Sequence, residues 1–310
     1  MTGCPITDSP DSNTITLHHL QPISTLIKNN PNLERLEITG PYSTSEYFGT
    51  NNSYSLCDVF RSVCVDSSIS PLQITELTLY NLEMNIWKEV IPHLKSLKSL
   101  DIAIPEAISK PSNFWSILHM AKIHLKKFVF QGAIDFTLLK YLRDSCSVLE
   151  SLHLRQITTS SAHTDLNRLA DIFYHLILPI PTLLELKIES DHEGKWCFGP
   201  HNADAIFKCP ALQDLGITLS EDQLNESIAL LTSYASSSPK FKSLTLSHPI
   251  SRGIWQDPPG EAHFYRADMN IKVQTALEAH GMGHVSHSVP YNMLLCGRIV
   301  RSAISLTFRV

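Results

Sequence analysis

The chain has 310 residues, of which 43% are hydrophobic and 18% are charged. This balance provides enough apolar side chain for a folded core and too little charge for an intrinsically disordered protein. Lysine and arginine total 25 against 30 acidic residues, and the net charge of -5 argues against electrostatic binding to nucleic acid or to an anionic membrane. We therefore expect a protein or peptide partner, and neither nucleic acid nor membrane.

The amino-terminal residues 1–13 are polar and are expected to form a disordered tail, followed by one domain over residues 14–310. They contain no basic stretch followed by an apolar one, which argues against a secretory signal. The 7 cysteines are scattered, so the sequence indicates neither a disulfide framework nor a zinc ribbon. A reducing compartment, the cytoplasm or the nucleus, is the expected location.

One pattern recurs along the chain: an apolar residue, two variable residues, leucine (phenylalanine in one copy), one variable residue and a last apolar residue. The last two apolar positions are two residues apart, which is typical of a short strand with one buried face. The copies, of which the ninth is the weakest, are Leu33/Leu36/Ile38, Ile74/Leu77/Leu79, Leu97/Leu100/Ile102, Leu125/Phe128/Phe130, Leu149/Leu152/Leu154, Leu183/Leu186/Ile188, Leu212/Leu215/Ile217, Phe241/Leu244/Leu246 and Ala303/Leu306/Phe308.

Between the copies, the apolar spacing changes to three and four residues, which indicates amphipathic helices. The helical sets include Leu138, Leu139 and Leu142 with Cys146; Leu166, Leu169, Ile172, Phe173 and Leu176; and Leu224, Ile228 and Leu231. Asp135 is expected to cap the helix that begins near Phe136. Ser220 and Gln223 are expected to form a capping box before Leu224.

Prolines mark the ends of several helices, because proline lacks the amide donor that a helix needs. Four of them stand two residues before the first apolar position of a copy: Pro31, Pro181, Pro210 and Pro239. An ordinary doubly wound α/β domain also alternates helices with strands, but its strands are buried on both faces and form continuous apolar runs. The one-sided strands of this chain favour a solenoid whose sheet has one open face.

The tryptophans fall into two groups. Trp87 and Trp115, together with Tyr141, lie in predicted helices and are expected to pack in the core. Trp196 and Trp255 lie in loop-like stretches that lengthen their repeats. Such insertions are common contact sites in solenoids, although each tryptophan can equally fold back over its own repeat.

The segments NNPNLERLEI, SVLESLHL, IPTLLELKI and CPALQDLGI resemble leucine-rich repeats of the ribonuclease-inhibitor-like kind. The style is most similar to the carboxy-terminal repeat regions of fungal F-box/leucine-rich-repeat proteins. The resemblance implies an α/β solenoid of about nine repeats, curved, with a parallel sheet on the concave side and helices on the convex side. In the F-box members, that concave surface holds substrates for a cullin-based ubiquitin ligase.

This chain departs from the F-box pattern, because residues 1–30 contain no proline-led, leucine-rich helix set. Residues 104–108 look superficially like an F-box opening, but they follow a repeat strand directly and are interpreted as a linker. The resemblance therefore implies a non-catalytic recognition array without a recognisable F-box. A regulator of a small GTPase or a ribonuclease inhibitor is a further possibility that rests on fold analogy alone.

Alternation along the strands predicts an open face on which basic and acidic residues are mixed. Its predicted positions are Arg35, Glu37, Thr39, Glu76, Thr78, Tyr80, Ser99, Asp101, Ala103, Lys127, Val129, Gln131, Ser151, His153, Arg155, Glu185, Lys187, Glu189, Asp214, Gly216, Thr218, Ser243, Thr245 and Ser247. Because the face carries no stripe of one sign, it suits a protein or peptide better than DNA or RNA. The candidate partner-binding residues are Tyr80, Lys127, Gln131, His153, Arg155, Glu185 and Lys187, and the alternative is a merely solvated sheet.

None of the common phosphate-loop, dinucleotide-binding, nucleophile-elbow or zinc-protease motifs occurs in the sequence, so we expect no enzymatic activity and no cofactor. The alternative is an enzyme or metal protein with a site in the irregular residues 249–298, where His280, His284, His287 and Cys296 are candidate zinc ligands. Within the same stretch, a helix from Tyr265 to His280 is predicted over a degenerate repeat strand at Met269 to Val273.

Overall fold

The computed structural model describes residues 14–17, 23–40, 55–65, 70–104, 113–145, 147–158, 163–178, 180–249, 261–280 and 304–307. The chain divides into two compact units. The amino-terminal unit comprises Met1–Asp101 and Pro111–Ile123, and the carboxy-terminal unit comprises Ile102–Lys110 and His124–Val310. Among the described residues, no helix has the length and apolar character needed to cross a membrane.

The amino-terminal unit contains three adjacent parallel strands, β1 (Thr14–Leu17), β2 (Arg35–Thr39) and β3 (Glu76–Tyr80). Strand β4 (Ser99–Ala103) lies at the division between the units. The helices of this unit are α1 (Ile23–Asn29), α2 (Leu56–Val65), η1 (Lys88–Val90), α3 (Ile91–Leu94) and α4 (Phe114–Met120). Strands and helices therefore alternate, as the repeating pattern predicts.

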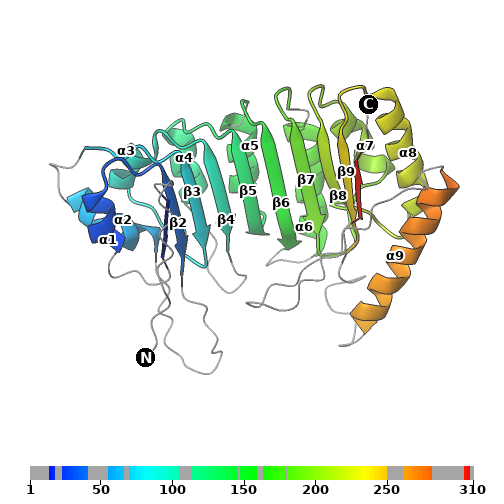
Figure 1. Ribbon diagram of the computed structural model, residues 1–310, viewed down its shortest axis with the longest axis horizontal. Coiled ribbons are helices and arrows are strands. Elements are labelled where there is room, and N and C mark those ends of the chain that lie inside the picture. The colour runs from blue at the N-terminus through cyan, green and yellow to red at the C-terminus, as the bar shows by residue number, and fades with distance from the viewer. Residues whose placement is uncertain are drawn as a thin grey trace. The chain divides into compact units, whose positions relative to one another are not determined.

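The carboxy-terminal unit contains five parallel strands, which follow one another in chain order: β5 (Lys127–Ala133), β6 (Ser151–Thr158), β7 (Glu185–Ser190), β8 (Asp214–Thr218) and β9 (Ser243–Ser247). Its helices are α5 (Phe136–Ser145), α6 (His163–Ile172), the π-helical η2 (Phe173–Ile177), α7 (Pro200–Phe207), α8 (Leu224–Ser237) and α9 (Glu261–Ala279). Helices α5 and α6 lie behind the sheet, and no described helix crosses the front of β5 to β7 (Figure 1).

The core of this unit is built from cross-strand rows of apolar residues. One row contains Phe128, Leu152, Leu186, Leu215 and Leu244, which are paired in register and are all buried. A second row, two residues further along each strand, contains Phe130, Leu154, Ile188, Ile217 and Leu246. The first eight copies of the sequence pattern therefore correspond to strands β2 to β9, and their apolar positions are buried as predicted.

The ninth copy does not continue the parallel sheet. Strand β10 (Ile304–Thr307) pairs antiparallel with β9, with Leu306 opposite Leu244. It begins beside Leu246, near the carboxyl end of β9, whereas a parallel strand would begin beside the amino end of β9. The prediction of a ninth unit of the same kind at Ala303/Leu306/Phe308 is therefore wrong.

The helix predictions have mixed outcomes. Helix α9 covers the predicted helix from Tyr265 to His280 almost completely, and no strand forms at Met269 to Val273. The backbone N–H of Leu138 donates to Asp135 Oδ1 at 2.9 Å, which confirms the predicted cap of α5.

The predicted capping box of Ser220 and Gln223 is wrong. Gln223 itself is the N-cap of α8, and it makes no side-chain capping bond. Its side-chain oxygen instead lies against Gly199, where a β-carbon would come within 2.3 Å of it. The Gln223 side chain therefore makes a long-range contact with Gly199 in place of the predicted capping bond.

Two apolar residues that were predicted to pack in the core are exposed. Leu176 is 61% exposed because η2 is π-helical, and the wider turn rotates Phe173, Tyr174 and Ile177 into the core instead. Trp87 is 41% exposed, and Arg61 lies over its ring at 5.9 Å.

The other predicted core aromatics, Trp115 and Tyr141, are buried. Trp196 also folds inward, because its Nε1 donates to the Leu166 carbonyl at 3.1 Å and its ring packs near Phe173. The alternative that Trp196 folds back onto the solenoid, rather than forming an exposed contact site, is therefore correct. Trp255 lies outside the described residues.

Candidate protein-interaction face

The front of strands β5 to β9, which we call the polar face, consists of the residues that alternate with the buried rows. Cross-strand pairing places Lys127, Ser151, Glu185, Asp214 and Ser243 in an outer row. A central row contains Val129, His153, Lys187, Gly216 and Thr245. Gln131 and Arg155 pair with each other beyond the central row. Six of the seven candidate residues therefore lie on one face of one unit.

Tyr80, the seventh candidate, belongs to β3 in the amino-terminal unit. Its hydroxyl donates to Asp101 Oδ2 at 3.3 Å, so the tyrosine is held by the neighbouring strand β4. This contact orients the ring within its own unit. Tyr80 is therefore described apart from the other six residues.

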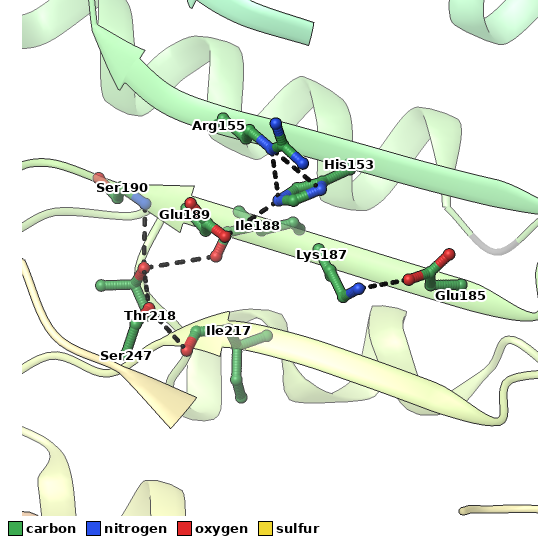
Figure 2. Close-up of polar contacts among 10 residues, drawn as sticks. All are labelled: His153, Arg155, Glu185, Lys187, Ile188, Glu189, Ser190, Ile217, Thr218 and Ser247. Carbon is green, nitrogen blue, oxygen red and sulfur yellow. Dashed lines mark hydrogen bonds and ion pairs between the residues drawn. The ribbon is translucent and has the colours of Figure 1, made fainter. Parts of the chain in front are cut away.

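His153 is the centre of a polar cluster on the polar face (Figure 2). Its Nε2 lies 3.0 Å from Glu189 Oε1, and Arg155 Nε donates to the ring, 3.2 Å from Nδ1. Arg155 Nε also lies 3.3 Å from Nε2, but the Glu189 carboxylate can only accept, so the proton of a neutral imidazole belongs on Nε2 and Nδ1 is the acceptor for Arg155. His153 therefore holds one basic and one acidic side chain in fixed positions.

The environment of His153 favours the neutral imidazole. Burial lowers the pKa of His153, and the positive charges of Arg155 and Lys187 lower it further, while the hydrogen bond and charge of Glu189 act in the opposite direction. The lowered pKa means that the opposing effect of Glu189 does not prevail. The contact between His153 and Glu189 is therefore a hydrogen bond that the neutral ring donates to the carboxylate at neutral pH.

The structure corrects the predicted exposure of several polar-face residues. His153 was expected to be open to solvent, but it is only 8% exposed, because Arg155 and Glu189 close over its ring. Val129 is also buried, as are Gly216, Thr218 and Ser247. These residues form the floor of the face rather than its contact surface.

Lys187 and Glu185, both on β7, form an ion pair on the polar face. Lys187 Nζ donates to Glu185 Oε1 at 2.5 Å, and Ser151 Oγ donates to Glu185 Oε2 at 2.7 Å. Burial by itself would raise the pKa of Glu185, but the hydrogen bonds from Lys187 and Ser151 outweigh it and lower the pKa. Gly216 makes room for the lysine stem, since a β-carbon there would approach Lys187 Cγ to 2.7 Å.

A hydroxyl network fastens the carboxyl ends of β7, β8 and β9. Thr218 Oγ1 accepts from the Ser190 N–H at 3.0 Å and lies 3.0 Å from Ser247 Oγ. Ser247 Oγ in turn donates to the Ile217 carbonyl at 3.2 Å. Because Thr218 is fully buried, this network links neighbouring strands and offers nothing to a partner (Figure 2).

Lys127 and Arg155 are the basic residues of the polar face that make no ion pair within the described part of the chain. Lys127 is exposed at the start of β5. Arg155 uses Nε to bond His153 (Figure 2), and its two terminal nitrogens have no bond to any residue that the structure describes. Both side chains can therefore receive an anionic group from outside.

The alternative metal site is tested only at one of its residues. His280 follows α9 and is exposed, whereas His284, His287 and Cys296 lie outside the described residues. Within the described ranges, no group of three histidine, cysteine or acidic side chains is arranged to hold a metal ion.

The cysteines of the described part are poor nucleophiles. Cys57 and Cys197 are both buried, and burial raises the pKa of Cys57 to about 11. Burial also raises the pKa of the Cys197 thiol. Since the thiolate is the reactive form, neither residue is activated for covalent chemistry.

Two features escaped the sequence predictions. Glu189 was placed on the face by alternation, but its bond to His153, which lies 36 residues away on the neighbouring strand, was not predicted. The other feature is a groove of about 630 Å³ between α8 and α9, lined by residues that include Glu221, Glu226, Ile271 and Lys272. No pattern within either helix indicates that the two helices meet.

Comparison with protein-family models finds no matching family, and comparison with curated proteins finds no match.

Proposed function

We propose that this chain is a non-catalytic recognition protein and that its polar face binds a protein partner. The observation that carries the proposal is the set of polar side chains on β6 and β7 that hydrogen bonds hold in place on the polar face (Figure 2), on the side of the sheet away from helices α5 and α6 (Figure 1). Ordered side chains lose less conformational entropy when a partner binds. The polar face is therefore suited to recognition.

The charges of the face favour a protein over a nucleic acid as the partner. Lys127, Arg155 and Lys187 alternate with acidic residues such as Glu185 and Asp214. A phosphate backbone requires a continuous basic track, whereas a protein surface presents both signs. A mixed face therefore supports a protein or peptide partner.

The resemblance to F-box/leucine-rich-repeat proteins suggests a finer proposal. The chain would act in the cytoplasm or nucleus as a substrate-recognition array related to ubiquitin-ligase receptors, in a curved solenoid of about nine repeats. Because residues 1–30 carry no F-box pattern, a purified cullin-ligase adaptor should not bind this chain directly. Direct binding in a gel-filtration assay would contradict that part of the proposal.

Site-specific photo-crosslinking tests the recognition function. The benzophenone amino acid p-benzoylphenylalanine would replace Thr245 on the polar face, which is half-buried in the central row. Its matched control would replace Lys140, which is exposed on α5 behind the sheet. Irradiation in an extract of the cells that make the protein should yield a discrete protein adduct from position 245 and none from position 140. Equal labelling from both positions, or none from position 245, would overturn the proposal.

A further inference from the structure

Lys127 and Arg155 differ from Lys187, the other lysine or arginine of the polar face, because they form no ion pair within the described chain. Lys187 is paired with Glu185, and Lys126, the neighbour of Lys127 in sequence, is paired with Glu150 at 2.7 Å. Arg143 on helix α5 is likewise paired with Asp144. The positive charge available on the polar face is therefore concentrated at two positions.

The acidic side chains of the polar face accept hydrogen bonds from neighbouring residues of the same face. Glu189 accepts the proton of His153, and Glu185 accepts bonds from Lys187 and Ser151. Asp214 Oδ1 accepts from Ser243 Oγ at 2.5 Å. These bonds hold the carboxylates in place, so Lys127 and Arg155 are the two basic positions on the face that can form a new ion pair with an incoming anion.

The strand register sets the spacing of the two basic positions. Lys127 pairs with Ser151, and Arg155 lies four residues further along β6. Four residues of strand span about 13 Å, and the two strands are about 4.8 Å apart. Residues four apart in an extended peptide lie on one side of it and span the same distance. The floor between them includes Val129 and His153, which are buried and carry no charge at neutral pH.

We propose that Lys127 and Arg155, which we call the basic pair, receive two carboxylates of an extended partner segment whose acidic residues are four positions apart. This inference rests on the proposed recognition function and names the chemistry of the partner. Arg155 would bind a carboxylate through its two terminal nitrogens, the arrangement in which a guanidinium recognises a carboxylate best. Lys127 would supply a point charge at the other end.

Selection from a displayed library of random dodecapeptides on the full chain tests the inference. The wild-type protein should enrich peptides with aspartate or glutamate at two positions four residues apart. Each selected peptide should then bind the variants Arg155→Ala and Lys127→Ala about tenfold more weakly, the loss typical of one charge-assisted contact. Lys127 is exposed and bonded to no described residue, so its variant remains informative if Arg155→Ala is less stable.

Two matched controls remove the same charge elsewhere. Lys126→Ala changes the neighbouring residue, and Arg143→Ala changes an arginine on α5. Both variants should bind the selected peptides as the wild type does. If the control variants lost as much peptide affinity, the effect would come from the net charge of the protein and not from the basic pair, and the inference would be overturned.

The outcomes for this inference and for the recognition function are distinct. Selection of peptides without acidic enrichment, or of no peptide at all, overturns the basic pair as an acid receptor. A discrete photo-crosslink from position 245 would still support the recognition function in that case. Acidic peptides that lose affinity only with Lys127→Ala and Arg155→Ala support the inference.

Discussion

His153 Nε2 lies 3.0 Å from Glu189 Oε1, although the two residues are 36 positions apart in the chain. The two side chains come from adjacent strands, and Arg155 Nε lies 3.2 Å from Nδ1 of the same imidazole. A neutral ring satisfies both neighbours, since it donates to the carboxylate and accepts from the guanidinium. A protonated ring would place a third positive charge beside Arg155 and Lys187.

This arrangement predicts a pH-dependent stability. Because the pKa of His153 is lowered in the folded state, the unfolded chain binds the proton first as the pH falls. The stabilisation is therefore complete above about pH 6.5, the ordinary pKa of histidine, and is lost as the pH falls from there through the lower folded pKa. Urea unfolding at a series of pH values between about 8 and 5 would measure this loss.

The variant His153→Gln isolates the contribution of His153, because glutamine can donate to Glu189 and accept from Arg155 without titrating. Its stability should fall less between about pH 6.5 and 5 than that of the wild type. His93 in the amino-terminal unit has a pKa lowered by burial as well, so some pH dependence should remain. Identical slopes for variant and wild type would contradict the prediction.

A second prediction concerns Leu152, which is fully buried in the core row of β6. Leu152→Ala should lower the free energy of unfolding by about 2 to 5 kcal/mol, because its neighbours cannot fill the cavity completely. Chemical denaturation would measure the change, and Lys140→Ala, on the exposed side of α5, should leave stability nearly unchanged. A loss of less than about 1 kcal/mol would be incompatible with full burial of Leu152.

His153 is not a neutral control for Leu152, although alternation alone would make it one. The structure buries His153, so His153→Ala removes the donor to Glu189 and the acceptor for Arg155. Loss of partly buried polar partners costs about 1 to 3 kcal/mol. We therefore expect a measurable destabilisation by the same denaturation assay, and a change below about 0.5 kcal/mol would show that the ring contributes little.

The contrast between these neighbours shows what sequence can predict. Burial of Leu152 follows from a local rule, because every second residue of a strand faces the core. Burial of His153 involves Glu189, a residue 36 positions away on the neighbouring strand, and the spacing of apolar residues does not indicate this contact. The strands and the residues of the polar face could thus be predicted from the sequence. The burial of His153 under Arg155 and Glu189 could not.

The same distinction holds for the helices and for the edge of the sheet. Asp135 caps α5 because its partner is three residues away, whereas Gln223 lies against the distant Gly199 and makes no cap. Leu176 follows the spacing of an α-helix, yet the π-helical turn exposes it. Leu306 matches the repeat pattern, but β10 pairs antiparallel with β9, and the spacing of apolar residues does not indicate the direction of a strand.

A third prediction tests the close contact between Gly216 and Lys187. Gly216→Ala would force Lys187 away from its place on the floor, because the new β-carbon would approach Lys187 Cγ to 2.7 Å. We expect a loss of about 1 to 3 kcal/mol in unfolding free energy, the usual range for overpacking. Thermal and urea unfolding of the single variant would measure it.

The Lys187→Ala background provides the control for Gly216→Ala. With the lysine stem removed, the same substitution should be neutral or slightly stabilising, because glycine within a strand costs about 0.5 to 1 kcal/mol relative to alanine. The double-mutant cycle should therefore give a coupling of at least about 1 kcal/mol between the two positions. Additive effects would mean that the contact does not determine the conformation of Lys187.

The last prediction concerns the buried hydroxyl of Thr218, which accepts from the Ser190 N–H and bonds Ser247 Oγ. Thr218→Val keeps the size of the side chain and removes the hydroxyl, so the Ser190 N–H is left without its acceptor. Denaturation should report a loss of about 1 to 3 kcal/mol, the cost of an unsatisfied buried polar group. Thr245→Val, on the adjacent strand β9, is the matched control, because Thr245 is only half-buried and should change stability by less than about 0.5 kcal/mol. Similar losses for both variants would show that the effect belongs to valine at these strand positions and not to the network at Thr218.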